Sequence, residues 1–175
     1  MRKSFTLIEL IVVIAIIAIL AAIIAPNAFK AIEKAKVSRF AQDVRAIRAA
    51  AMAFYADTGQ WPADNDGGAT QDPTTLGKGF INNDNGSGSL IEGWDGPYVE
   101  KWPLNPWGGI YYWDSDTGDE NLNGIFPERT VIVFNIQGAI EQKIDDMFDN
   151  GNLQNGFIFH QDAANLLGWI VVEGQ

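Results

Sequence analysis

The amino-acid sequence predicts an α+β protein in which one long amino-terminal α-helix packs on a small antiparallel β-sheet. Three observations predict this fold class. Residues 5–25 form an apolar run that can cross a membrane, and residues 37–54 repeat apolar side chains at alternating spacings of three and four. Short runs rich in β-branched and aromatic residues, bounded by turn residues, follow from residue 110 onward. We therefore expect a helix whose first half spans a membrane, followed by a head of sheet and loops.

The apolar run is long enough for a membrane span. From Leu10 to Ala25 there is no polar side chain, and extending the run back to Phe5 adds only Thr6 and Glu9. At ~1.5 Å per residue, a run of this length covers the ~30 Å hydrocarbon core of a bilayer. A cleaved signal peptide would have a shorter apolar run of ~7–15 residues followed by a small-residue cleavage site. Here the run leads directly into more helix.

Glu9 is the exception within this run. A carboxylate near the start of a spanning helix costs roughly 2.5 kcal/mol or more unless it finds a partner. We therefore expect Glu9 to pair with a positive group. The alternative is that Glu9 lies near the membrane interface and stays hydrated.

Beyond Pro26 the apolar residues become periodic and define one face of a helix. That face consists of Val37, Phe40, Val44, Ile47, Ala51 and Phe54. Pro26 should kink the helix or open it locally, because proline has no amide hydrogen and clashes with the preceding turn. The helix is expected to run from about Phe5 to Asp57 and to end at Gly59. The apolar face within residues 27–58 is too large to stand in water, so a sheet should cover it.

The amino-acid composition excludes several classes of function for this protein. The 175 residues suffice for one domain with a hydrophobic core. They hold 12 basic and 22 acidic side chains, and the formal net charge of -10 disfavours nucleic acid as a partner. The chain has no cysteine and a single histidine, which excludes thiolate and histidine-rich metal sites and a cysteine nucleophile.

The charges are unevenly distributed along the chain. Residues 30–48 contribute six basic and two acidic side chains, whereas residues 49–175 contribute four basic and nineteen acidic ones. The six bases, here called the basic collar, are Lys30, Lys34, Lys36, Arg39, Arg45 and Arg48. Next to an apolar run, the basic collar is interpreted as a solvated or lipid-headgroup surface. This pattern indicates a chain that meets a membrane at one end and water at the other.

The head is predicted to begin with loops and to end with a sheet. Residues 59–109 are rich in Gly, Asp, Asn and Pro, which favour turns. The sheet and a short helix are assigned to residues 110–175. Strands are predicted at residues 110–113, 130–135 and 168–173, with a weaker one at 157–159.

The short helix lies between the predicted strands. Its apolar residues, four apart, are Ile136, Ile140, Ile144 and Phe148. The pair Asp145-Asp146 is interpreted as its solvated face, and His160 as a satisfied or surface residue rather than a catalyst. The six tryptophans are expected to serve core packing rather than a ligand platform.

The amino-terminal stretch Lys3-Ser4-Phe5-Thr6-Leu7-Ile8-Glu9-Leu10 resembles the class III signal of the type IV pilin and type II secretion pseudopilin superfamily. The resemblance implies that residues 1–4 are a leader and that a prepilin peptidase cuts between Ser4 and Phe5. It also implies that the new Phe5 amine is methylated, and that Glu9 neutralises the Phe5 ammonium of a neighbouring subunit during assembly. Ser4 stands where the family prefers Gly.

Two later stretches extend the resemblance over most of residues 1–113. Residues 53–62 resemble the helix exit of major pseudopilins, and residues 96–111 resemble the segment before their first strand, with Asn105 in place of the usual Asp. The resemblance implies a pilin fold, divided into residues 1–4, 5–26, 27–58 and 59–175. The tail from Ile136 onward differs from the compact major pseudopilin pattern.

An oxygen-rich loop follows the first predicted strand. Asp and Asn residues recur through residues 114–124, and hard cations such as calcium bind six to eight oxygens. The spacing is not that of an EF-hand. Because major pseudopilins bind calcium in this general region, the resemblance supports a calcium site; the alternative is a solvated acidic turn. The candidate ligands are Asp114, Asp116, Asp119, Asn121 and Asn123.

These observations predict a structural subunit of a type IV pilus-like extracellular filament. The resemblance implies an inner-membrane precursor in contact with lipid, a prepilin peptidase, an inner-membrane assembly platform and a homo-oligomeric helical filament. One alternative is the major pseudopilin of a type II secretion system, in a periplasmic pseudopilus. A different class of alternative is a single-span membrane-anchored binding domain or enzyme. Because no nucleophile-elbow, phosphate-loop or dinucleotide pattern occurs, we assign no catalytic residues and expect no enzyme activity.

Overall fold

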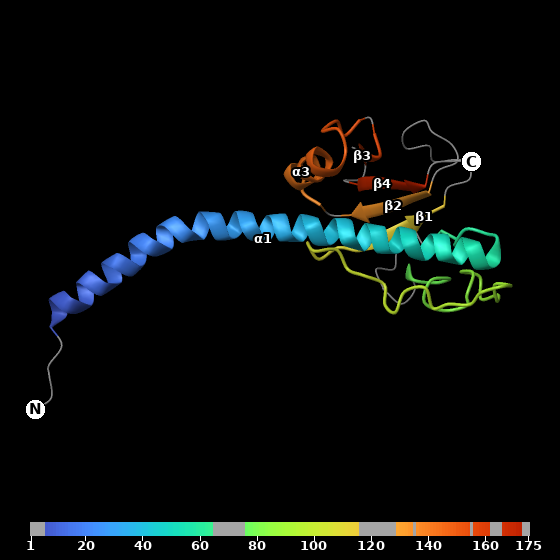
Figure 1. Ribbon diagram of the computed structural model, residues 1–175, viewed down its shortest axis with the longest axis horizontal. Coiled ribbons are helices and arrows are strands. Elements are labelled where there is room, and N and C mark those ends of the chain that lie inside the picture. The colour runs from blue at the N-terminus through green and yellow to red at the C-terminus, as the bar shows by residue number, and fades with distance from the viewer. Residues whose placement is uncertain are drawn as a thin grey trace, which may run out of the picture. The chain divides into compact units, whose positions relative to one another are not determined.

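The computed structural model confirms the predicted α+β class, with one long apolar helix and a small antiparallel sheet (Figure 1). The structure describes residues 6–64, 76–115, 129–134, 136–154, 156–161 and 166–172. The named elements are α1 (Leu7–Thr58), β1 (Tyr111–Asp114), β2 (Arg129–Phe134), α3 (Gly138–Phe148), β3 (Ile158–Gln161) and β4 (Leu166–Val172). The chain divides into two compact units, residues 1–38 and 39–175, and the division falls inside α1.

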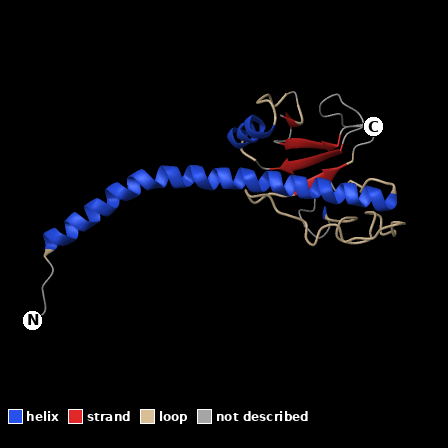
Figure 2. Cartoon of the chain, in the orientation of Figure 1, coloured by secondary structure: helices blue, strands red, loops and turns tan. Residues whose placement is uncertain are grey.

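In the first unit, residues 10–25 of α1 are apolar on all sides. Every residue from Thr6 to Ile32 is exposed, and α1 is long and apolar enough to cross a membrane by length and composition. The helix continues through Pro26 without a break, so the proline does not open it (Figure 2). A helix that is apolar all round needs an apolar environment on every side.

The second half of α1 has the predicted one-sided burial. All six residues of the expected apolar face, from Val37 to Phe54, are at most 2 % exposed. The helix ends as predicted: Gly59 has a φ of +69°, in the left-handed region that glycine tolerates best, and the Thr58 hydroxyl donates to the Phe54 carbonyl at 2.8 Å.

The four described strands form one sheet in the order β1-β2-β4-β3, and every neighbouring pair is antiparallel. All four lie within two residues of the predicted positions. Ile132 on β2 lies between Tyr112 on β1 and Gly168 on β4, and Phe159 on β3 faces Gly168 from the other side. A Cβ at Gly168 would lie only 2.1 Å from the Phe159 ring, so this strand position needs glycine to make room for the ring.

Phe40 of α1 is the centre of the contact between the helix and the sheet. Its ring centroid lies 5.9 Å from that of Tyr111 on β1, 5.8 Å from that of Trp169 on β4 and 5.9 Å from that of Trp107. Trp102 and Trp113 are fully buried, which confirms core packing for these two tryptophans.

The loop region between α1 and β1 is fastened to the carboxyl end of the helix. The Tyr98 hydroxyl donates to Asp57 Oδ2 at 2.9 Å, and Trp94 Nε1 donates to the Gly79 carbonyl at 2.6 Å. At Gly93, where φ is +80°, a Cβ would lie 2.7 Å from the Asp57 carbonyl oxygen. The predicted turn residues therefore form an ordered layer over the helix end.

Asn105 organises the turn that leads into β1. It is 4 % exposed, and its Oδ1 accepts hydrogen bonds from the backbone amides of Trp107 at 2.9 Å and Gly109 at 3.0 Å. These bonds hold Trp107 where its ring meets Phe40. Because a carboxylate oxygen could accept the same two bonds, the geometry explains how Asn can replace Asp at this position.

The Asn105 turn yields a stability prediction. Asn105→Ala should lower the free energy of unfolding by about 2–4 kcal/mol, because each buried amide left without an acceptor costs about 1–3 kcal/mol. Asn105→Asp keeps the acceptor and should stay within about 1 kcal/mol of the wild type. Denaturant unfolding of the full chain in detergent micelles, followed by tryptophan fluorescence, measures both.

Asn85 provides the matched control. Its Oδ1 also accepts two backbone amides, those of Ser87 at 3.0 Å and Ser89 at 3.1 Å, but in an exposed loop. Since water can replace this acceptor, Asn85→Ala should cost less than about 0.5 kcal/mol. Equal losses for the two alanine variants would contradict the assigned role of the Asn105 turn.

Candidate functional site

The predicted processing residues Ser4 and Phe5 lie outside the described residues, which begin at Thr6. The candidate assembly site is therefore described from Thr6 and Glu9, at the start of α1. Their geometry shows how a carboxylate is accommodated at the beginning of an apolar helix.

Thr6 and Glu9 form a reciprocal cap on α1. Glu9 Oε2 accepts hydrogen bonds from the Thr6 backbone amide at 2.8 Å and from the Thr6 hydroxyl at 2.7 Å. The Glu9 amide donates to Thr6 Oγ1 at 3.3 Å. This is a capping box, in which a hydroxyl residue and an acid three positions later satisfy amides that lack partners at a helix start.

The cap gives Glu9 a partner inside its own chain. The spacing of Thr6 and Glu9 is the sequence signature of a capping box, and the sequence reasoning, which considered only a positive partner or hydration, overlooked it. Both bonds to the carboxylate end on Oε2, so Oε1 carries neither of them. The arrangement fixes the helix start and holds a negative charge at its positive dipole end.

The residues that follow Glu9 offer a continuous apolar surface. No charged side chain occurs between Leu10 and Phe29. Large side chains around the helix are half or more exposed, among them Leu10 at 57 %, Ile17 at 58 % and Ile24 at 61 %. Such a surface can insert into lipid or pack against apolar helices of other molecules.

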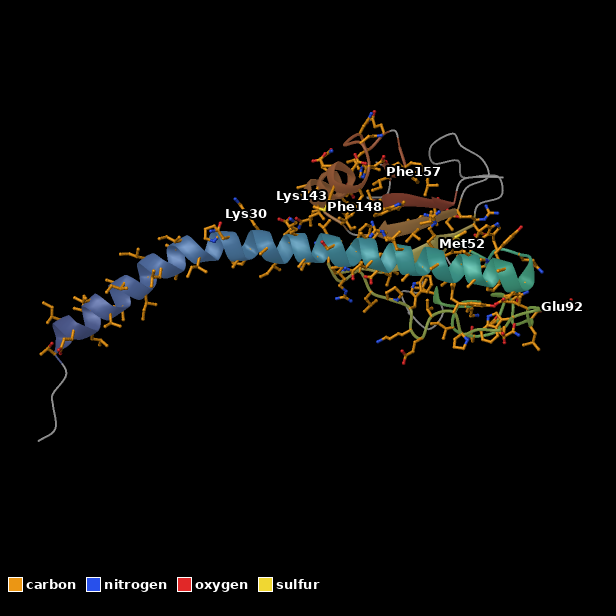
Figure 3. The ribbon with its side chains drawn as sticks, viewed as in Figure 1. Lys30, Met52, Glu92, Lys143, Phe148 and Phe157 are labelled. Atoms are coloured by element: carbon orange, nitrogen blue, oxygen red, sulfur yellow. The ribbon has the colours of Figure 1, made fainter. Side chains whose placement is uncertain are left out.

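The basic collar begins where this apolar surface ends. Lys30 is exposed (Figure 3), as are all the other collar residues except the half-exposed Lys36. Arg39 Nε lies 3.8 Å from Asp43 Oδ2, which also accepts a hydrogen bond from the Tyr111 hydroxyl at 3.0 Å. Burial raises the pKa of Asp43, whereas the hydrogen bond from Tyr111 and the charge of Arg39 act in the opposite direction.

The candidate calcium ligands are almost all outside the described residues. Only Asp114 is described; it ends β1 and lies opposite Thr130 of β2. Asp116, Asp119, Asn121 and Asn123 belong to the segment that is not described. Among the residues the structure does describe, no group of three or more His, Cys, Asp or Glu side chains could hold a metal ion. The calcium site stays a prediction.

The fold and the amino-terminal segment define a type IV pilin-like protein, and comparison with known families supports this class. A family model described as "Prokaryotic N-terminal methylation motif" matches residues 1–25, and one described as "PilW, C-terminal" matches residues 31–126. Since the second match covers more than half of the chain, the protein belongs to the PilW C-terminal family. Neither the curated proteins nor the solved structures gave a match.

These matches confirm the resemblance found in the sequence. The methylation motif covers the stretch around Ser4 and Phe5, and the PilW match covers the middle region, including Asn105. The protein is therefore related to type IV pili. The methylation motif implies processing by a prepilin peptidase and a membrane-anchored precursor.

The candidate calcium loop yields a second prediction. If calcium binds residues 114–123, removing it with EGTA should lower the melting temperature of the full chain by a few degrees, because a ligand that binds only the folded state stabilises it. Differential scanning calorimetry in detergent with calcium or EGTA measures the change. In an Asp116→Asn, Asp119→Asn double variant, the difference between calcium and EGTA should vanish. An unchanged wild-type melting temperature would refute the calcium site.

Proposed function

We propose that this protein is a structural subunit of a type IV pilus-like extracellular filament, assembled through its apolar amino-terminal helix. The observation that carries the proposal is the first half of α1, which is apolar on every side from Leu10 onward and begins with a capped carboxylate. The cap satisfies amides at the helix start in an anchor and in a filament subunit alike, whereas a positive partner for the Glu9 charge is expected from a neighbouring subunit only in a filament.

In this proposal the precursor lies in the inner membrane until a prepilin peptidase cuts between Ser4 and Phe5. The cut removes Arg2 and Lys3 and frees the Phe5 amine. An inner-membrane assembly platform then moves the processed subunit out of the lipid and into the filament. The apolar halves of α1 bundle at the centre of the filament and leave the acidic heads outside.

In this assembly, Glu9 sets the axial register between neighbouring helices, and is called the register device in that sense. Two opposite charges in a low-dielectric core are tolerable as a pair and costly alone. Thr6 already provides two hydrogen bonds to Oε2. The Phe5 ammonium of a neighbouring subunit would supply the missing positive charge. This charge pair can form at only one axial offset between neighbouring helices.

The edges of the sheet support assembly through helices rather than through the heads. At the β3 edge, the Ile158 amide donates to Asp149 Oδ2 and the His160 amide donates to the Leu153 carbonyl, both at 2.9 Å. On β1, the Tyr111 carbonyl accepts a hydrogen bond from Trp102 Nε1 at 2.9 Å. Because edge groups with partners are poor templates for strand addition, a further copy would not extend the sheet at these positions.

The α3 helix and the strands after it favour a pilus subunit over a compact major pseudopilin. They occupy residues 138–172, the part of the chain that departs from the major pseudopilin pattern. Together with the PilW match, this tail supports an extracellular filament rather than a periplasmic pseudopilus.

The proposal predicts the fate of a Glu9 variant. Glu9→Gln keeps an acceptor for Thr6 but removes the charge, so it should be cleaved and methylated normally yet fall at least about tenfold in the sheared filament fraction. Glu92→Gln removes an exposed head charge and should assemble like the wild type. Quantitative blotting of sheared and membrane fractions, with intact mass and amino-terminal sequencing, measures both.

Three outcomes would contradict the proposal. A wild-type chain that retains Met1 and stays in the membrane would favour a single-span anchored domain. Short periplasmic fibres that depend on a secretion system would favour the pseudopilin alternative. Normal assembly of Glu9→Gln would remove the charge pair as the register device.

A further inference from the structure

We propose that the contact between α3 and β3, here called the joint, becomes more stable in acid. The pair of Glu141 and His160 holds the helix on the sheet, and buried Asp145 weakens this contact when its carboxylate is ionised. The proposal rests on three side chains at one interface.

The first observation is the pair that joins the two elements. Glu141 Oε2 on α3 lies 2.8 Å from His160 Nδ1 on β3, and the two elements lie next to each other (Figure 1). The side chain of Glu141 is 2 % exposed and that of His160 is 21 % exposed. The carboxylate is therefore shielded from water, while the imidazole is partly exposed.

The second observation is Asp145, one turn further along α3. It is fully buried, and neither carboxylate oxygen has a hydrogen-bond partner among the described residues. The sequence interpretation of Asp145-Asp146 as a solvated face is correct for Asp146 and wrong for Asp145. The apolar residues of α3 lie four apart, which moves the buried face by ~40° at each step. The buried face therefore widens to include Glu141 and Asp145 beside Ile140 and Ile144.

The acids that neighbour Asp145, one on α3 and one directly after it, have other partners. Asp146 Oδ1 accepts a hydrogen bond from Gln142 Nε2, and Asp149 Oδ2 accepts one from the Ile158 amide, both at 2.9 Å. Both acids repel an ionised Asp145. Ionised Asp145 therefore adds a negative charge to a region that already holds several.

The bases and neutral side chains around the joint come from every adjacent element. On α3, Lys143 is exposed (Figure 3). On α1, the Arg45 guanidinium lies 5.9 Å from the centroid of the Phe148 ring. From β4, Trp169 packs its ring on Phe148 at 5.5 Å and carries no charge. The imidazole of His160, on β3, is the basic group placed against Glu141.

The sign of the pH dependence follows from this geometry. Burial, and secondarily the charges of Asp149 and Asp146, raise the pKa of Asp145 above its ordinary value. The packed helix therefore holds the Asp145 proton more tightly than an opened or unfolded one does. Stability is gained as the pH falls through the folded-state pKa, and the gain is complete below the unfolded value of ~3.9.

Hydrogen exchange of the α3 amides tests the joint in the full chain in detergent micelles. After correction for intrinsic exchange rates, wild-type protection should rise as the pH is lowered from 7.5 toward the unfolded Asp145 value of ~3.9, by up to about tenfold per pH unit while Asp145 titrates. Asp145→Asn and Asp145→Ala remove the buried charge. Both should be protected at pH 7.5 and lose most of the pH dependence. Asp146→Asn and Asp146→Ala are matched controls one residue away, on the exposed side; they remove only a secondary cause of the raised Asp145 pKa and should keep most of the pH dependence.

Several results would overturn the joint. One is wild-type α3 protection that does not change with pH; another is an Asp146 variant that loses the pH dependence as an Asp145 variant should. Loss of folding in both Asp145 variants would contradict the expected gain in stability. Protection restored at pH 7.5 by calcium in the wild type, but not in Asp145→Asn, would show that the carboxylate binds a metal instead.

Discussion

The apolar surface of α1 is the constraint on which the rest of the structure depends. One helix carries two different surfaces: residues 7–32 are exposed and mostly apolar, whereas residues 37–54 are buried along one face only. The first surface can be satisfied only by lipid or by other apolar helices. The second is covered by the chain itself, which explains why a head with a sheet follows the helix. The basic collar marks the change from one environment to the other.

Aromatic packing joins the parts of the head around α1. Phe40 meets rings from β1, β4 and the turn before β1, and Trp169 in turn packs on Phe148 of α3. A few large side chains therefore tie the helix, the loop, the sheet and the second helix into one core. Large aromatic residues bury more area per residue than aliphatic ones, which suits a small sheet with long loops.

The buried polar groups of the head show why Asp145 stands apart. Asn105 accepts two backbone amides, and Asp43 accepts the Tyr111 hydroxyl and faces Arg39. Each of these groups regains inside the protein what it loses in water. Asp145 has no such compensation within the described part of the chain. A protein that keeps a carboxylate in this position accepts lower stability when the group is ionised, and that cost is what makes the contact of α3 with the sheet responsive to acid.

The sequence by itself determined the elements and the class of the protein. Apolar periodicity placed α1, its buried face and α3, turn residues and β-branched runs placed the strands within two residues, and the stretch around Phe5 indicated a type IV pilin relative. These signals are local, because a helix or strand is encoded by spacings of two to four residues. Only the tertiary structure decided the strand order, the fit of Phe159 over Gly168 and the meeting of Glu141 with His160. These depend on which distant segments pack together, and the same packing turned Asp145 inward although its sequence neighbourhood resembles a solvated helix face.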